Sequence, residues 1–187
     1  MVLALLGGLA LAQTAADIGQ FKVERVDDEI LASAQVGFEL PAVVEDALLK
    51  GIPMYFTVQA DILRERWYWY DKKQVSVGRQ LRLAYQPLTR RWRLNVTSGA
   101  TADSAVGLSL NQSFDTLLQS LSAIKRLSRW RIADTSELDA GVRYKVDLRF
   151  YLDLSQLPRP FQIGAIGKSD WDIAAAASTT FQLDSAK

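Results

Sequence analysis

The fold is decided by residues 54–70, which read MYFTVQADILRERWYWY. From Met54 to Ile62 an apolar residue recurs at every second position, which is the period of a half-buried β-strand. Four consecutive aromatic residues end the stretch, so a strand continuing through them carries aromatic surface on both faces. We therefore expect at least one of these faces to pack on a helix, a second sheet, a ligand, a membrane or a partner.

The apolar residues change parity within this stretch. The even-numbered positions give way to Trp67 and Trp69, which predicts a bulge or a sharp bend at residues 62–66. Both tryptophans are then expected to face the core, and Tyr68 and Tyr70 are expected on the exposed side.

Alternation of the same kind predicts strands on either side of this one. With turns at residues 27–28, 71–74 and 87–90, and a loop rich in small residues at 98–109, the connections are short enough for antiparallel pairing. The last segment is the least defined, because its four alanines also permit a helix. The predicted strands lie around residues 21–26, 30–40, 54–70, 75–85, 92–96, 130–132, 144–152 and 172–183.

Two short helices are predicted between the strands. The first has Pro41 in its first turn and Gly51 just past its end, and its apolar stripe consists of Val43, Val44, Ala47 and Leu48. The second covers residues 114–124, with Asn111 as its N-cap. Prolines on either side of Arg159 are predicted to end the strand before them.

These elements predict an α+β fold. Its main part is an antiparallel β-sheet of about eight strands, either open or folded into a sandwich, with two short helices on one face or end. A chain of 187 residues suits one domain with a real core, which we place at residues 13–187.

Composition excludes several classes of function. The chain has no Cys and no His, so Ser-His-Asp and Cys-His catalysis and imidazole or thiolate metal sites are impossible. We expect no cofactor and no metal. The net charge of +1 argues against nucleic acid as a partner.

The amino terminus predicts export. Met1 to Ala12 are apolar or small, too few to span a bilayer but typical of a signal-peptide core, and Ala10 and Ala12 suit a cleavage site before Gln13. The alternative is a buried amino-terminal helix or strand. Export through this segment predicts a periplasmic protein, soluble or peripherally associated with the envelope and not transmembrane once the signal is removed.

Positive charge gathers in the middle of the chain, where residues 61–93 hold seven Arg and two Lys against three acidic residues. Arginine rows beside aromatic side chains bind lipid headgroups and acidic glycans, although such a face is more often only a solvated sheet surface. The side chains predicted to bind a ligand on this face are Arg64, Arg66, Tyr68, Tyr70, Arg91 and Arg93.

Two catalytic alternatives rest on weaker patterns. Ser122 and Lys125 have the S-x-x-K spacing of penicillin-recognising enzymes, but the S-D-N and K-T-G motifs of those enzymes are absent. A pair of carboxylates for glycoside hydrolysis would have to come from residues far apart in the sequence. The candidates for such a pair are Glu39, Glu45, Asp147, Asp153, Asp170 and Asp172.

The chain resembles a family of proteobacterial exported proteins known only as a domain of unknown function. The resemblance lies in RERWYWYD (residues 64–71), LTRRWRL (88–94) and LSQLPRPFQ (154–162). It implies an envelope location, often with a gene for a nitrogen-regulation-type sensor kinase beside it, and it implies no catalytic residues.

Three functions follow as expectations, in descending order. The first is a non-catalytic module of the cell envelope that binds a partner protein, with the sensor kinase as one partner. The second is a binder or carrier of an anionic envelope lipid or glycan through the Arg and Tyr residues above. The third is a carboxylate-dependent hydrolase.

Overall fold

A computed structural model describes residues 16–64, 72–99, 108–165 and 171–183. Its helices are α1 (Ala42–Leu49), α2 (Leu117–Lys125) and α3 (Arg159–Ala165), with short 3-10 turns η1 (Thr135–Glu137) and η2 (Leu154–Gln156). Its strands are β1 (Asp17–Val26), β2 (Glu29–Gly37), β3 (Met54–Arg64), β4 (Lys72–Gln86), β5 (Arg91–Gly99), β6 (Leu108–Phe114), β7 (Arg126–Asp134), β8 (Arg143–Leu152) and β9 (Ala174–Gln182).

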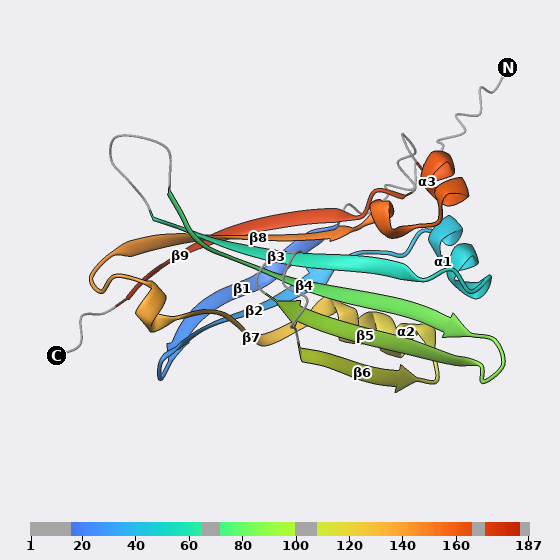
Figure 1. The fold of residues 1–187 in the computed structure, drawn as a ribbon, viewed down its shortest axis with the longest axis horizontal. Coiled ribbons are helices and arrows are strands. Elements are labelled where there is room, and N and C mark those ends of the chain that lie inside the picture. Colours follow the sequence, from blue (N-terminus) through green and yellow to red (C-terminus); the bar gives the residue numbers. More distant parts are fainter. Residues whose placement is uncertain (1–15, 65–71, 100–107, 166–170, 184–187) are drawn as a thin grey trace, which may run out of the picture.

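These strands form two antiparallel sheets (Figure 1). The larger has six strands in the order β6-β5-β4-β3-β8-β9, and the smaller has three in the order β1-β2-β7. All pairings among the described strands are antiparallel. The α+β class and the predominantly antiparallel sheet predicted from the sequence are therefore confirmed.

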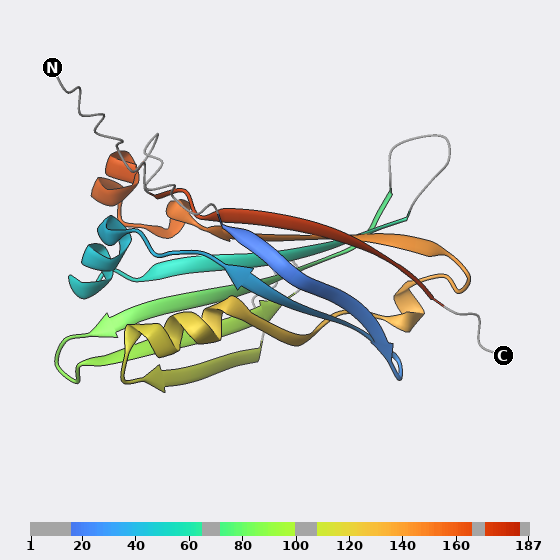
Figure 2. The same cartoon turned by 180° about the vertical axis from the view of Figure 1, so that it is seen from behind.

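The small sheet lies against one face of the large one, and the two sides of this sandwich differ (Figure 2). On one side β1 packs against β9 and closes the gap between the sheets. On the other side the edge strands are β6 and β7, which belong to different sheets and are linked by α2. This second side is where the molecule has its cleft.

The core lies between the sheets and is built by the alternation seen in the sequence. In β8 the side chains of Tyr144 and of every second residue up to Leu152 are buried, as predicted. Phe56 and Phe150 pack with Phe38, with ring centroids 5.4–5.7 Å apart. Burial of each such ring contributes about 1.5–3 kcal/mol to folding.

Helix α1 begins and ends where the sequence indicated. Pro41 occupies the N-cap position, and Gly51 follows the helix with a φ of 83°, a backbone conformation that glycine adopts without strain. The predicted apolar stripe is only partly buried: Val44, Ala47 and Leu48 face the core, whereas Val43 is 37% exposed.

The second helix starts later than predicted. Its N-cap is Thr116, whose hydroxyl accepts a hydrogen bond from the backbone N–H of Gln119 at 3.2 Å. Asn111, predicted to be the cap, lies in β6 instead, together with Phe114. The prediction failed because the polar Asn and Ser of an edge strand resemble a helix start.

Two further elements were not predicted. Strand β6 begins at Leu108 and β5 continues to Gly99, so both ends of the expected loop at 98–109 belong to strands. Helix α3 follows β8, with Pro160 in its first turn, where a missing N–H costs nothing. The last segment, open to either structure from its alanines, is strand β9.

The bulge predicted within β3 does occur beside it, but the extra residue belongs to the neighbouring strand β4. Ile62 pairs with Val75 and Leu63 pairs with Lys73, so the extra residue is Gln74 of β4. The pairing of β3 with β8 continues without a shift. Lys72 and Lys73 belong to β4, so the turn predicted at 71–74 is wrong, while Trp67 and Trp69 lie outside the described residues.

Candidate functional site

The structure does not bring the predicted arginines together. Arg64 pairs with Lys72 at one end of β4, and Arg91 pairs with Gln86 at the other end. At about 3.3 Å per residue, these two ends lie roughly 45 Å apart along the strand. Arg64 on β3 and Arg91 on β5 are not on neighbouring strands, because β4 lies between β3 and β5. Arg66, Tyr68 and Tyr70 lie outside the described residues.

Two of these arginines have acidic partners within the protein. Arg64 forms an ion pair with Asp139 at 2.7 Å, and Arg91 forms one with Asp115 at 2.7 Å. Arg93 is exposed on β5. Exposed pairs of this kind are typical of a solvated sheet surface and contribute little to stability. Whether these side chains bind a ligand stays a prediction.

The S-x-x-K pattern does not place its two side chains together. The Ser122 hydroxyl donates a hydrogen bond to the backbone oxygen of Leu118 at 2.8 Å. The Lys125 ammonium lies over the ring of Phe38, 4.8 Å from its centroid. Neither group activates the other.

A carboxylate pair does occur, on the outer face of the large sheet, with a member that the sequence did not indicate. Asp61 of β3 stands directly opposite Asp147 of β8 in the strand register. Asp61 accepts hydrogen bonds from Ser76 at 2.6 Å, from Gln59 at 3.2 Å and from Arg149 at 2.7 Å. Asp147 accepts one from Ser178 at 2.6 Å and pairs with Lys145 at 3.1 Å.

Asp61 is kept ionised by these partners. Its side chain is only 2% exposed, and burial alone acts to raise its pKa. Hydrogen bonds from Ser76, Lys73 and Gln59 outweigh burial and hold the pKa of Asp61 below its ordinary value. A carboxylate that is fully engaged and holds no proton is a poor general acid, so we interpret this cluster as structural.

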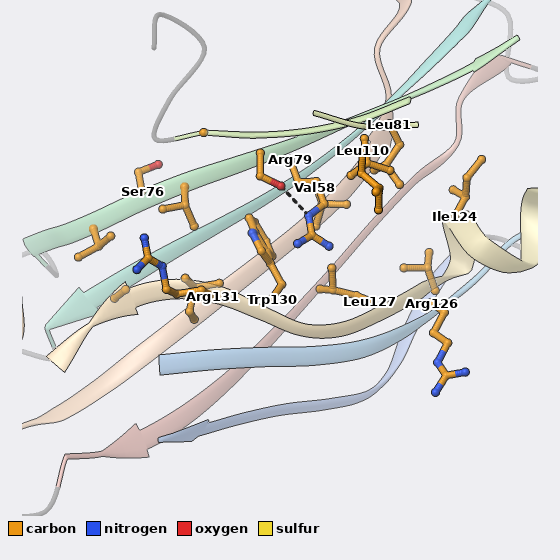
Figure 3. A pocket seen from close by; sticks show the side chains of 18 of the residues that line it. Val58, Ser76, Arg79, Leu81, Leu110, Ile124, Arg126, Leu127, Trp130 and Arg131 are labelled. Carbon is orange, nitrogen blue, oxygen red and sulfur yellow. Dashed lines mark hydrogen bonds between the residues drawn. The ribbon is translucent and has the colours of Figure 1, made fainter. Parts of the chain in front are cut away.

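The more informative feature is a cleft between the two sheets, with a volume of about 880 Å³ (Figure 3). Its walls come from β4, β5 and β6 of the large sheet and from β7 and the end of α2. Small-molecule sites in proteins typically measure roughly 300–1,000 Å³. Apolar side chains form most of its lining, among them Val58, Leu81, Leu94, Val96, Leu110, Ile124, Leu127 and Ile132.

One cation lies within this apolar lining. Arg79 occupies an inward-facing position of β4, and its Nε donates a hydrogen bond to the hydroxyl of Ser98, its cross-strand partner, at 3.1 Å. Its guanidinium carbon lies 5.2 Å from the ring centroid of Trp130 on β7, so the cation faces the indole across the cleft.

The electrostatic environment of Arg79 is unusual. No ion pair among the described residues includes it. Burial lowers the pKa of Arg79 from its ordinary value, although a guanidinium remains charged at neutral pH. A desolvated charge is normally paired, and here the protein supplies a hydroxyl and an aromatic face in place of a carboxylate.

The sequence contains a sign that Arg79 is unusual, although this residue was not among the predicted site residues. Val75, Val77, Leu81 and Leu83 share one parity of β4, and Arg79 interrupts that apolar row. A charge at a core-facing position of a strand is the informative exception to the pattern. What the sequence did not contain is the partner strand β7, which places Trp130 across from it.

Over the described ranges, none of the helices is long and apolar enough to cross a membrane, and no group of three or more acidic side chains is placed to hold a metal ion. No curated protein and no solved structure matches the chain. Residues 13–182, however, match the family model described as a domain of unknown function, DUF4390, and the chain therefore belongs to that family.

Proposed function

We propose that this protein is a non-catalytic binding module that holds an apolar ligand in the cleft between its two sheets. The observation that carries this proposal is the cleft itself, whose volume of about 880 Å³ is lined mainly by aliphatic side chains. Sandwiches normally fill the space between their sheets with interdigitating side chains, so an open cleft of this size is a candidate binding site.

The floor of the cleft supports a ligand of extended shape. Val96 on β5 lies between Leu81 of β4 and Leu110 of β6 in the strand register. Val96 is only half-buried, and Leu110 is 56% exposed although it lines the cleft. Val96 and Leu110, neighbours on two strands beside the buried Leu81, are apolar side chains that the protein leaves partly uncovered, as ligand-binding or interaction surfaces do.

The non-catalytic part of the proposal rests on the polar groups around the cleft. The chain contains no His and no Cys. Of the acidic side chains lining the cleft, Asp134 pairs with Arg131 at 3.3 Å and Glu137 accepts the backbone N–H of Asp134 at 2.7 Å. Both carboxylates are engaged in local contacts, so neither is a free base among the described residues that line the cleft.

The cleft can be tested by filling it. We expect Val96→Phe to weaken the binding of the neutral fluorescent probe N-phenyl-1-naphthylamine by roughly tenfold or more, because the added ring occupies the floor of the cleft. Thr97→Phe is the matched control, since Thr97 is the next residue of the same strand and is exposed on the outer face. Binding is measured by fluorescence titration of each purified protein.

Two results would overturn the proposal. One is a wild-type protein that does not enhance the fluorescence of the probe, and the other is an equal loss of binding in both variants. Thermal unfolding of both variants checks that the fold has survived. Mass spectrometry of the undenatured protein purified from its host adds a direct search for a bound apolar molecule.

We place this module in the periplasm, in soluble or peripherally associated form. The support is the apolar segment at residues 1–12, which is typical of an export signal, together with the family resemblance. Fractionation of cells that express the full chain tests it. Recovery in the cytoplasmic fraction with the first 12 residues retained would contradict export.

Binding of a protein partner is a second candidate function, favoured by the edge strand β6. Its sequence, LSLNQSF, has neither a charged residue nor a proline to discourage pairing with another strand. The sensor kinase implied by the resemblance is the partner we would seek, by cross-linking in an envelope fraction. We expect Ser113→Lys, which adds a charge to this edge, to reduce the cross-link, and unchanged cross-linking would exclude β6 as the contact.

A further inference from the structure

The geometry of the cleft points to the class of ligand. We infer that it binds an anionic amphiphile, an apolar chain that ends in a carboxylate or a phosphate, and that Arg79 binds the anionic end. This inference rests on the proposed function, because it concerns the same cleft.

The first support is the position of Arg79. Its neighbours of the same parity on β4 are Val77 and Leu81, so it stands in a row of core-facing apolar residues. Removing a cation from water costs free energy that an anion in the same site recovers. The protein places this charge in the cleft instead of on the outer face, where Arg82 of the same strand lies exposed.

The second support is the set of contacts that Arg79 makes. A guanidinium has five N–H donors, and the contact with Ser98 uses the one on Nε. Trp130 covers one face of the group. Among the contacts of the described residues, the two terminal nitrogens have no acceptor, and these are the atoms that bind a carboxylate or phosphate in a bidentate manner.

The third support is that the other cations of the cleft are paired with carboxylates or point away from it. Arg131 pairs with Asp134 at 3.3 Å and with Glu29 at 3.6 Å. Arg126 points out of the cleft in Figure 3, and its Nε donates to the hydroxyl of Ser128 at 3.1 Å. Among the described lining residues, Arg79 is therefore the cation that points into the cleft without a carboxylate partner.

The fourth support is the asymmetry of the lining (Figure 3). On one side of Arg79 and Trp130 the labelled side chains are aliphatic except for Arg126, which points away, and on the other side they are a hydroxyl and a second arginine. The aliphatic side consists of Leu81, Leu110, Ile124 and Leu127, and the polar side includes Ser76 and Arg131. An amphiphile with its chain toward α2 and its head at Arg79 matches both sides.

The experiment compares four compounds as competitors of the neutral probe: dodecanoate, dodecyl phosphate, dodecanol and inorganic phosphate. We expect the wild-type protein to bind at least one of the two anionic chains roughly tenfold or more tightly than dodecanol, because a charge-assisted hydrogen bond adds to the shared apolar contact. Preference between dodecanoate and dodecyl phosphate identifies the head group.

Arg79→Gln should abolish this preference while leaving the affinity for dodecanol within about threefold, since only the recognition of the anion is removed. Arg82→Gln is the matched control. The Nε of Arg82 donates to the Tyr55 hydroxyl at 3.1 Å, and its guanidinium lies 5.9 Å from the ring centroid of Tyr55. Arg82 therefore makes, on the outer face, the same kinds of contact that Arg79 makes with Ser98 and Trp130. The control variant should retain the wild-type preference. If Arg79→Gln proves unstable, Arg79→Lys is the alternative. It keeps the positive charge but removes the planar pair of N–H donors, so a weaker preference for the anionic chains would show that bidentate binding matters.

The outcomes separate the two proposals. Equal binding of dodecanol and both anionic chains by the wild-type protein would overturn the inference about Arg79 but leave the apolar cleft intact. Inorganic phosphate bound as tightly as dodecyl phosphate would overturn the requirement for an apolar chain. Failure of all chain compounds to displace the probe would contradict the proposed function itself.

Discussion

At the scale of single residues, the two charges that matter most to this fold are Asp61 and Arg79, and they are satisfied in opposite ways. Asp61 is nearly inaccessible and has partners on three strands, including Lys73 at 2.9 Å. Arg79 has a hydroxyl and an aromatic ring, with no carboxylate partner among the described residues. The first arrangement is that of a structural ion cluster, and the second leaves part of the guanidinium available.

We expect Asp61→Asn to lower the free energy of unfolding by about 2–4 kcal/mol at neutral pH, because it leaves Arg149 and Lys73 without the charge that they neutralise. Asp147→Asn is the control. Asp147 stands opposite Asp61, but its own contacts are with Lys145 and Ser178. Its replacement should lower the free energy of unfolding by less than about 1 kcal/mol. Urea unfolding of the three proteins measures the difference, and equal losses would contradict the central role of Asp61.

The difference in stability between the wild-type protein and Asp61→Asn should depend on pH. Because the pKa of Asp61 in the folded chain is below its ordinary value of 3.8, the folded state binds fewer protons than the unfolded state as the solution is acidified. The stabilisation by ionised Asp61 is therefore fully present above about pH 3.8 and is lost as the pH falls through the lower pKa that Asp61 has in the folded chain. The stability gap between wild type and Asp61→Asn should narrow as the pH falls below 3.8, and a gap independent of pH would contradict this expectation.

At the scale of elements, the strands could be predicted wherever apolar residues alternate regularly with polar ones. Of the three described helices, the sequence predicted two. Strand β8 shows the strongest alternation and was assigned correctly, and so were the hairpin at Asp27 and the end of α1 at Gly51. Strand β6 was missed because its polar side chains face solvent at an edge, where no burial pattern is imposed. The bulge was assigned to β3 although Gln74 of β4 forms it, because the parity of one strand does not reveal which partner carries the extra residue.

The corrected start of α2 can be tested by mutation. We expect Thr116→Ala to lower stability by about 1 kcal/mol, since it removes the acceptor for the Gln119 backbone N–H. Asn111→Ala, at the cap position indicated by the sequence, removes only an exposed side-chain contact with Asn95 and should cost less than about 0.5 kcal/mol. Chemical denaturation of both variants decides between the two caps, and a larger loss for Asn111→Ala would contradict the observed boundary.

At the scale of the whole molecule, the sequence left open whether the antiparallel strands form one sheet or fold into two, and it did not reveal the position of the cleft. The cleft depends on how β7 is placed over β4, and these strands are about fifty residues apart in the chain. Two members of the predicted arginine and tyrosine site, Arg64 and Arg91, lie beside opposite ends of β4, and the sequence did not reveal this separation for the same reason. Pairing between distant strands is a tertiary property that local patterns do not encode.

The difference between the closed and open sides of the sandwich also has a kinetic consequence. On the open side β6 and β7 belong to separate sheets, so no backbone ladder joins them across the mouth of the cleft. If the cleft binds a ligand as proposed, that ligand can enter or leave by rearranging side chains such as Leu110, with the hydrogen bonds between the described strands intact. Its release would then need no partial unfolding and would be limited by rotamer motion and desolvation, which would suit transfer of a ligand more than its storage.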